Sequence, residues 1–331
     1  MTHASSEHGA VAIIGGGAAG MSCALWLRHL GFTPIIIDQR DELGGQLLRI
    51  NRVNQWVLGM PHHTSPELAS RYARHVLEEN IQVNLGARLS ACVADGKSFV
   101  LMVEESDRPS TSLHVGALVV ATGMRVKTRD ALGETPGFES LYTSGRLSFF
   151  PIDHLEQEEQ LQGKIVAVIG GGDNAHFTVN DVAPVASRTH LLIRSRPHAQ
   201  RTIRKSVEAL IEQGVVTEHQ GTEVAGFQIH QGRIQIALTK QDCAADPITV
   251  DRIFARTGFA PNTEFLEPFE LLSTLRKDAD GYLMVDQWKR TSVPRVYAIG
   301  DVSNPKHPAV VTAIADGAIA ARAIAQDLGP S

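Results

Sequence analysis

Two glycine-rich segments of the 331-residue chain have the residue types and the spacing that bind phosphate groups. The first, Gly15-x-Gly17-x-x-Gly20, follows the apolar run 10–14. In such a loop the first glycine permits a tight turn, the second lets the backbone approach a pyrophosphate, and the third lets the next helix pack on the strand. The helix N-terminus adds free N–H donors and a partial positive charge. Asp38 ends the next apolar run, where a carboxylate accepts hydrogen bonds from ribose hydroxyls.

The second segment, Gly170-x-Gly172-x-x-Ala175, repeats this pattern after the run 165–169. Basic residues rather than an acid follow its second strand, and they are Arg194, Arg196, Arg201 and Arg204. Guanidinium groups bind a 2′-phosphate bidentately, whereas a carboxylate repels it. The first loop therefore predicts a nucleotide with free ribose hydroxyls, and the second favours NADPH, with NADH also possible. The alternative interpretation of 193–205 is a solvated basic loop.

Composition excludes several classes of protein. The chain is 43% hydrophobic and 20% charged, with a formal net charge of −5. This apolar content supports a folded core rather than disorder, and the negative balance argues against generic binding to nucleic acid or to an anionic membrane. No apolar run approaches the ~20 residues of a membrane helix, and the run 10–14 is too short for a signal-peptide core. We therefore expect a cytoplasmic protein without nucleic-acid or membrane partners.

The cysteines are few and widely separated, at Cys23, Cys92 and Cys243. They form no CxxC pair and no clustered set of metal ligands, so we expect neither a disulfide scaffold nor a metal site. Unpaired thiols are typical of a reducing compartment. His62 and His63 are expected at the surface, because no third ligand is spaced for a metal.

Strands and helices alternate around both loops, which predicts an α/β fold with parallel sheets. A helix is expected over 65–80 with Ser65 as its N-cap, and a final helix over 309–326. Asp173 and Asn174 have an alternative interpretation as simple N-cap residues. The other expected elements are helices at 18–30, from about 173 and at 202–213, and strands at 34–38, 98–103, 113–121, 165–169, 189–193, 223–238, 248–254 and 295–299.

Taken together, the motifs resemble the low-molecular-weight thioredoxin reductase family over nearly the whole chain. The segments that carry the resemblance are GGGAAG at 15–20, GGQL at 44–47, VNQW at 53–56, ATG at 121–123, GGGDNA at 170–175 and AIGD at 298–301. The resemblance implies two Rossmann-like three-layer domains and a homodimer. The FAD-binding domain would comprise 1–123 and 258–331, with an NAD(P)H-binding domain, 124–257, inserted in it. Hinges are expected near Gly123 and Gly258.

The resemblance also implies roles for individual residues. Gly44, Gly45 and Gln46 would line the isoalloxazine, Asp301 would hold the ribityl chain, and the helix 309–326 would direct its positive N-terminus at the flavin. The residues expected to bind FAD are Gly15, Gly17, Ala18, Ala19, Gly20, Asp38, Gln39, Gly45, Gln46, Leu47, Gln55, Thr122, Gly123, Gly300, Asp301, Val311 and Thr312. The residues expected to bind NADPH are Gly170, Gly172, Asp173, Asn174, Ala175, Arg194, Arg196 and Arg201. No catalytic side chain is expected, because the flavin carries the chemistry.

Two features depart from that family. Thioredoxin reductases carry a redox CxxC just before the second loop, but here 147–155 reads LSFFPIDHL. Without a dithiol, electrons cannot pass from flavin to a thioredoxin disulfide by the usual exchange. This segment resembles instead the ferredoxin–NADP reductases of thioredoxin-reductase type. The family's His-Arg-Arg motif stands here as Arg194-Ser195-Arg196.

The sequence therefore predicts an FAD-dependent NAD(P)H oxidoreductase. Hydride would pass from NADPH to FAD, and electrons would then go to ferredoxin or flavodoxin. One alternative is a redox sensor or partner-binding protein that binds FAD and NADPH with little turnover. A second alternative is a thioredoxin-reductase-like enzyme that uses the dithiol of a partner protein.

Overall fold

The computed structural model describes residues 9–105, 108–304 and 306–329. The chain divides into two compact units: unit 1 holds the residues up to Arg125 and from Ala260 onward, and unit 2 is Val126–Phe259. It crosses between the units in two short strands that pair with each other, β8 (Met124–Val126) and β17 (Phe259–Pro261). The boundaries expected from the sequence, after 123 and before 258, lie next to these strands.

Unit 1 is built around a five-stranded parallel sheet in the order β18-β7-β1-β2-β3. Its strands are β1 (Ala10–Ile14), β2 (Thr33–Ile37), β3 (Gln82–Asn84), β7 (Ala117–Val120) and β18 (Val296–Ala298). The central strand β1 is apolar throughout and all its residues are buried, as a strand covered on both faces requires. Ile13 is paired in register with Ile36 on one side and Val119 on the other.

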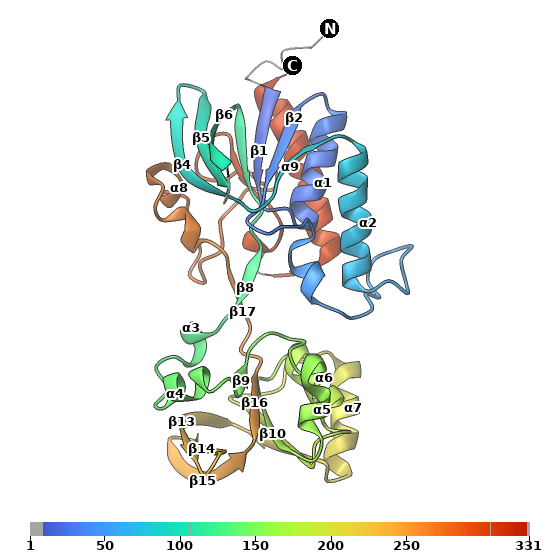
Figure 1. Ribbon diagram of the computed structural model, residues 1–331, viewed down its shortest axis with the longest axis vertical. Coiled ribbons are helices and arrows are strands. Elements are labelled where there is room, and N and C mark those ends of the chain that lie inside the picture. The colour runs from blue at the N-terminus through green and yellow to red at the C-terminus, as the bar shows by residue number, and fades with distance from the viewer. Residues whose placement is uncertain (1–8, 106–107, 305, 330–331) are drawn as a thin grey trace. The chain divides into compact units, whose positions relative to one another are not determined.

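Both faces of this sheet are covered, which gives unit 1 three layers (Figure 1). One face is covered by helices α1 (Ala18–His29), α2 (Ser65–Glu78) and α9 (Val310–Leu328), and the other by the antiparallel strands β4 (Ala87–Asp95), β5 (Ser98–Glu105) and β6 (Arg108–Val115). Val11 and Ile13 pack in the helix-side core, whereas Ala12 and Ile14 pack in the core beneath the antiparallel sheet. Because side chains alternate along a strand, one apolar run supplies two cores.

Helices α1 and α9 cross very closely, although they come from opposite ends of the chain. A Cβ on Gly317 would lie 2.6 Å from the carbonyl oxygen of Ala19 and 2.7 Å from the backbone nitrogen of Cys23. The hydroxyl of Ser22 donates to the carbonyl of Ile314 at 2.7 Å. Small residues at this crossing therefore hold α9 against the helix that begins at the first glycine loop.

The run 113–121, expected as one strand, forms two strands. β6 ends at Val115 and β7 begins at Ala117, and the two belong to different sheets. Gly116 lies between them and donates its N–H to Ala10. The sequence of the run 113–121 did not reveal that the chain passes there from one sheet to another.

The N-cap of α2 is Thr64 and not Ser65 as expected. Thr64 Oγ1 accepts the N–H of Glu67 at 3.4 Å, and the N–H of Thr64 donates to Glu67 Oε2 at 2.7 Å. This reciprocal pair is a capping box, and its threonine and glutamate are three residues apart in the sequence.

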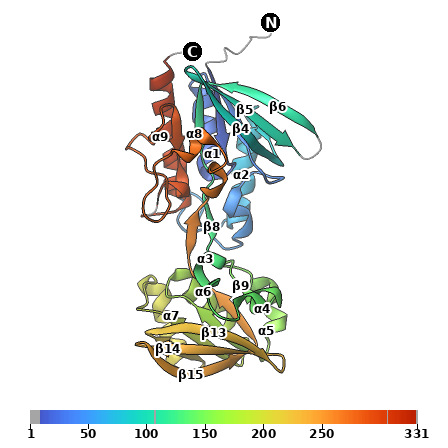
Figure 2. The same cartoon turned by 90° about the vertical axis from the view of Figure 1, so that its left-hand side faces the viewer.

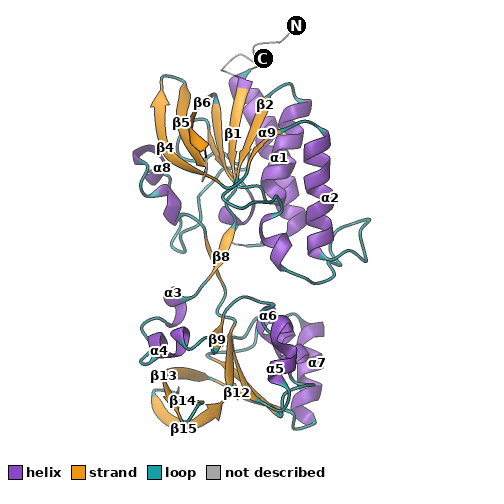
Figure 3. Cartoon of the chain, in the orientation of Figure 1, coloured by secondary structure: helices purple, strands orange, loops and turns teal. Residues whose placement is uncertain are grey.

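Unit 2 repeats the three layers of unit 1 (Figure 3). Its parallel sheet has the order β12-β11-β10-β16-β9, with β9 (Leu147–Ser148), β10 (Ile165–Ile169), β11 (Arg188–Ile193), β12 (Val216–Gln220) and β16 (Arg252–Ala255). Helices α5 (Glu158–Leu161), α6 (Asp173–Val182) and α7 (Arg201–Glu212) lie on one side of this sheet. Val166 and Val168 pack in the core with α6 and α7, and Ala167 and Ile169 in the core on the other face.

That other face is covered by an antiparallel sheet, seen in Figure 2, of β13 (Thr222–His230), β14 (Arg233–Lys240) and β15 (Cys243–Val250). The expected strands 223–238 and 248–254 are therefore each divided between two strands. The shorter helices are α3 (Arg129–Leu132), α4 (Phe138–Thr143), α8 (Glu270–Ser273), η2 (Gly45–Arg49), η3 (Leu155–Gln157), η4 (Glu264–Leu266) and η5 (Gly300–Val302). Within the described ranges, no helix combines the length and apolar character needed to cross a membrane.

Candidate functional site

The first glycine loop joins β1 to α1 with the backbone shape that its sequence predicts. Gly15 has φ +115°, in the left-handed region that favours glycine. A Cβ on Gly15 would approach the carbonyl oxygen of Ala121 closer than 3.0 Å, and a Cβ on Gly20 would do the same to the carbonyl oxygen of Gly15. Side chains at these two positions would push the strand end and the helix apart.

Gly17, the second glycine, has open space on the side where a side chain would lie. It is the N-cap of α1 with φ −76°, a conformation that any residue can adopt. Apart from its chain neighbours, no described atom lies within 4 Å of the position that a Cβ on Gly17 would take. No acidic residue lies in the first turn of α1, so its free N–H groups can meet a phosphate.

Asp38 follows β2 and is buried beside the loop. Its Oδ2 accepts the N–H of Gly16 at 2.6 Å, and its Oδ1 accepts the N–H of Arg40 at 2.9 Å. A carboxylate has about four acceptor positions, so these two bonds leave capacity for ribose hydroxyls. The predicted loop and the predicted acid are therefore joined directly by a hydrogen bond.

The short helix η2 packs against the same loop. A Cβ on Gly45 would lie 3.1 Å from the Cα of Gly17. The side-chain amide of Gln46 donates to the carbonyl of Met124. The GGQL segment is thus placed beside the first glycine loop.

Thr122 and Gly123 follow β7 and are bound to Asn262, a residue that the sequence alone does not identify. The hydroxyl of Thr122 donates to Asn262 O at 2.8 Å, and Asn262 Nδ2 donates to Thr122 O at 2.9 Å. The N–H of Asn262 donates to Gly123 O at 2.9 Å. Pro261 and Asn262 are turn-forming residues and could have indicated a turn, but not its partner.

Asp301 presents a buried acceptor that lacks a donor. Its Oδ1 has no hydrogen-bond partner among the described residues. Burial, and secondly the charge of Asp316, raise the pKa of Asp301 to about 6. Asp316 accepts the N–H of Gly300 at 3.2 Å and pairs with Lys289 Nζ at 2.6 Å. Leaving a buried acceptor unsatisfied costs about 1–3 kcal/mol, and the hydroxyls of a ribityl chain would satisfy it.

The remaining residues expected at FAD differ in exposure. Thr312 lies in the first turn of α9, where its hydroxyl donates to His307 O and Ala309 O, both at 2.9 Å. Ala19 and Leu47 are buried and Ala18 is half-buried, whereas Gln39, Gln55 and Val311 are exposed. The open loop, the acceptor of Asp301 and the first turn of α9 together fit a dinucleotide that carries a ribityl chain.

The second glycine loop joins β10 to α6 and has the same backbone shape as the first. Gly170 has φ +144°, and a Cβ there would approach the carbonyl oxygen of Arg256 closer than 3.0 Å. Ala175, at the third position, is buried. Gly172 is the N-cap of α6, and a Cβ on it would lie 3.0 Å from Nε2 of His198. No pattern in the sequence indicates that this imidazole covers the loop.

Asp173 is the first residue of α6 and is not its N-cap, so its N-cap interpretation is wrong. Its Oδ1 accepts the N–H of Gln200 at 2.7 Å, and its Oδ2 accepts the side-chain amide of Gln200 at 2.8 Å. Gln200 is the N-cap of α7. Asp173 therefore ties the start of α7 to the start of α6.

The three arginines predicted to bind NADPH are exposed. Arg194 and Arg196 follow β11, and Arg201 is the first residue of α7. In the part of the chain that the structure describes, none of the three forms an ion pair. Their guanidinium groups can therefore meet an anionic ligand without first losing a carboxylate.

The segment 147–155 contributes to a buried polar network in unit 2. Nε2 of His154 lies 2.6 Å from Oδ2 of Asp181, and Nη2 of Arg256 lies 3.3 Å from Nδ1 of His154. Nε of Arg256 donates to the hydroxyl of Thr178 at 2.9 Å. These partners are far apart in sequence, which is why the network could not be predicted.

All three cysteines are free. Burial raises the pKa of the Cys23 thiol far above its ordinary value and that of Cys92 to about 11. A thiol held in its protonated form is a poor nucleophile, so neither is suited to disulfide exchange. Cys23 lies in the core, and Cys243 is exposed on β15.

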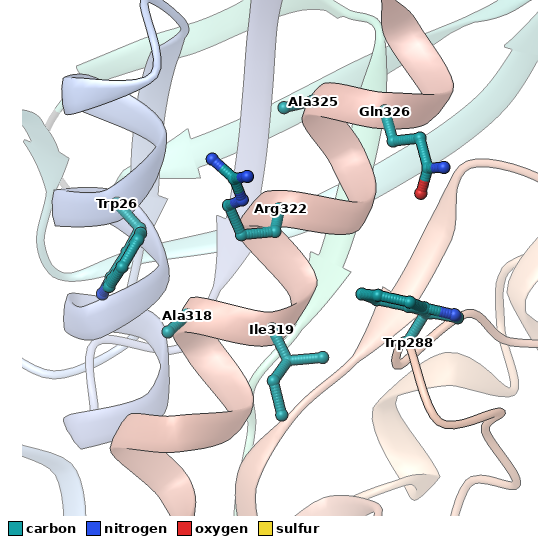
Figure 4. Close-up of a pocket in the computed structure, with 7 residues that line it drawn as sticks. All are labelled: Trp26, Trp288, Ala318, Ile319, Arg322, Ala325 and Gln326. Atoms are coloured by element: carbon teal, nitrogen blue, oxygen red, sulfur yellow. The ribbon is translucent and has the colours of Figure 1, made fainter.

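The described residues contain no cluster of ligands suited to a metal ion. The cavity shown in Figure 4 has a volume of about 610 Å³ and contains no predicted cofactor-binding residue. Its lining residues are Trp26, Trp288, Ala318, Ile319, Arg322, Ala325 and Gln326. It lies over α1 and α9 of unit 1.

Comparison with known proteins identifies the family. The model of the family "Pyridine nucleotide-disulphide oxidoreductase" matches residues 9–317. The chain belongs to this family. Its members bind FAD and NAD(P)H, so both predicted cofactors are confirmed at the level of the family.

Among curated relatives, the chain is 25% identical over 315 residues to the F subunit of alkyl hydroperoxide reductase from Xanthomonas campestris pv. phaseoli, with 94% of this chain and 55% of the relative covered. It is 26% identical over 313 residues to an NADH dehydrogenase of Bacillus subtilis, with 94% and 57% covered. The chain therefore spans about half the length of these relatives.

Among solved structures, thioredoxin reductase of T. acidophilum superposes with a TM-score of 0.78 at 23% identity, covering 96% of this chain and 97% of that one. Bacillithiol disulfide reductase of Bacillus cereus gives 0.79 at 20% identity, covering 96% and 98%. At these identities the likeness concerns the fold, and the predicted α/β two-domain fold is confirmed.

Proposed function

We propose that this chain is an FAD-dependent NAD(P)H oxidoreductase in which unit 1 holds FAD and unit 2 holds NADPH, with ferredoxin or flavodoxin as electron acceptor. One observation carries the proposal: two glycine loops of the same shape differ in the charge beside them, and the segment before the second loop holds no thiol. Family membership supports the two cofactors.

Residues of unit 1 would bind and orient the flavin nucleotide. The first turn of α1 would receive the pyrophosphate, Asp38 the ribose hydroxyls, and Asp301 the ribityl chain. Bound FAD supplies the redox chemistry, because it can accept a hydride and release electrons one at a time. The N-terminus of α9 would stabilise negative charge on the reduced ring.

Residues of unit 2 would bind the pyridine nucleotide. The N–H groups at the start of α6 would receive its pyrophosphate, and Arg194, Arg196 and Arg201 would receive the 2′-phosphate of NADPH. Gly123 and Gly258 have φ values of +65° and +96°, and no described atom beyond their chain neighbours lies within 4 Å of a Cβ on either. This freedom supports their proposed role as hinges.

A second candidate is a thiol-linked reductase that uses the dithiol of a partner protein. The names of two fold neighbours favour it, since one is a thioredoxin reductase and the other a bacillithiol disulfide reductase.

Anaerobic mixing of the purified flavoprotein with NADPH or NADH tests the proposal. We expect the flavin absorbance to bleach within seconds and to recover when ferredoxin or flavodoxin is added. A flavin that both nucleotides leave oxidised would contradict the oxidoreductase proposal. Fast reduction without turnover on any acceptor would favour the redox-sensor alternative.

An acceptor screen then separates the two candidates. Ferredoxin, flavodoxin, quinone, oxygen and disulfide substrates are compared at equal NADPH, with gel filtration to check for the proposed homodimer. Turnover that requires a dithiol protein would favour the second candidate. Turnover with ferredoxin or flavodoxin alone would favour the first.

A further inference from the structure

The second glycines of the two loops have the same backbone but different surroundings. Gly17 and Gly172 are both N-caps with extended backbone, at φ −76°, ψ −176° and φ −95°, ψ −175°. No described atom beyond its chain neighbours lies within 4 Å of a Cβ on Gly17. The position of a Cβ on Gly172, by contrast, lies 3.0 Å from Nε2, 3.5 Å from Cδ2 and 3.8 Å from Cε1 of His198. The imidazole therefore occupies, in the second loop, the space that is open in the first.

The backbone of His198 is fixed to this loop, whereas its side chain is exposed. The N–H of His198 donates to the carbonyl of Gly171 at 2.8 Å. Pro197 restricts the chain on one side, and Gln200, on the other, is bound twice to Asp173. The His198 side chain itself is exposed. Rotation about its Cα–Cβ bond can therefore carry the ring into solvent without moving the loop.

We propose that His198 determines access of a dinucleotide pyrophosphate to the second glycine loop. The proposal rests on the assignment of the pyridine nucleotide to unit 2. The second glycine of such a loop is where the backbone approaches the pyrophosphate, so the ligand and the present orientation of the imidazole exclude each other. Binding requires the ring to rotate away, so the apparent association constant is the intrinsic constant multiplied by the fraction of molecules in which the ring has rotated.

This mechanism predicts a dependence on ligand chemistry. NADP⁺, NAD⁺ and ADP-ribose contain a pyrophosphate and must displace the ring. 2′-AMP carries only the 2′-phosphate and needs no access to Gly172. Removal of the imidazole therefore tightens the binding of the first three ligands and leaves that of 2′-AMP unchanged.

Isothermal titration calorimetry of the FAD-loaded protein with these four ligands tests the proposal. The variant His198→Ala removes the ring, and His198→Phe keeps a somewhat larger aromatic ring without the nitrogens. The matched control, His230→Ala, removes an exposed histidine elsewhere in unit 2. We expect about fivefold tighter binding of the three pyrophosphate ligands by His198→Ala, because the loop is then open in every molecule. His198→Phe and His230→Ala should bind like the wild type.

Several outcomes would overturn the proposal. Weaker or unchanged binding of the pyrophosphate ligands by His198→Ala would mean that the imidazole contacts the ligand or has no effect on access. An equal gain for 2′-AMP, or the same gain in His198→Phe, would show that the cleared space is not the cause. Failure of the proposed function would be seen separately. If neither NADPH nor NADH reduces the flavin, the proposed function fails, but the affinities of the variants for the four ligands can still be measured and compared with those of the wild type.

Discussion

The two glycine loops have one backbone shape and opposite surroundings. In unit 1, Gly17 faces open space and the acid Asp38 follows the next strand. In unit 2, Gly172 faces the imidazole of His198, and Arg194 follows the next strand. The shape comes from glycines inside the motif, whereas the residues that we propose select the ligand lie about 20 positions or more beyond it. A glycine motif therefore predicts the shape of a dinucleotide-binding loop, but not which dinucleotide the loop binds.

The largest effect is expected inside the first loop. Gly20→Ala places a Cβ against the carbonyl of Gly15, and should lower the free energy of unfolding by about 3 kcal/mol through overpacking. Gly17→Ala should keep the fold, since its backbone is extended and its surroundings are open, yet weaken FAD binding. Urea denaturation and FAD titration measure the two quantities. Equal losses of stability in both variants would contradict the separate roles of the two glycines.

The second effect concerns Asp301, whose pKa is raised by burial and by Asp316 to about 6. A raised pKa means that the folded apoprotein binds the proton more tightly than the unfolded chain. The stabilising contribution is therefore full below the ordinary carboxyl pKa and is lost as pH rises through about 6. A shift of this size corresponds to about 3 kcal/mol.

Asp301→Asn should remove this pH dependence, stabilise the apoprotein at pH 7, and weaken FAD binding. Thermal unfolding of the FAD-free protein between pH 4 and 8 measures the pH dependence of its stability. A variant whose stability follows the same pH curve as the wild type would show that another group is responsible.

The third effect concerns the arginines that follow strand β11 of unit 2. Replacing Arg194 and Arg196 together by alanine should raise KM for NADPH about tenfold, because charged hydrogen bonds to the 2′-phosphate are lost. KM for NADH should change little. Steady-state kinetics with both nucleotides measure the ratio, and an equal loss for both would mean that the two arginines do not select the 2′-phosphate.

The smallest effect is expected at the exposed thiol. Cys243→Ser on β15 should leave NADPH turnover unchanged, since this side chain lies in the antiparallel sheet of unit 2. Turnover measured with the preferred acceptor checks this. A large decrease would show that the Cys243 thiol takes part in turnover.

The sequence predicts those parts of the site that depend on short stretches of chain. The two loops and the Gly300-Asp301 turn are found this way because each follows a strand and precedes a helix in the sequence. Asp38 is found because it directly follows the second strand of the first motif. His198 over Gly172, Asn262 beside Thr122, and the His154 network could not be found. Their partners are brought together by sheet topology, and no local pattern marks them.

The close crossing of α9 over α1 affects the order in which the protein can fold during synthesis. Unit 2 is one continuous stretch, Val126–Phe259, so its whole sequence is available before the last part of unit 1 is made. Until β18 (Val296–Ala298) and α9 emerge, β7 has an unpaired edge and α1 an uncovered face. At ~5–20 residues per second, the ribosome takes several seconds to supply them. We expect the nascent chain to need protection from aggregation through that interval, with its second domain folded before its first.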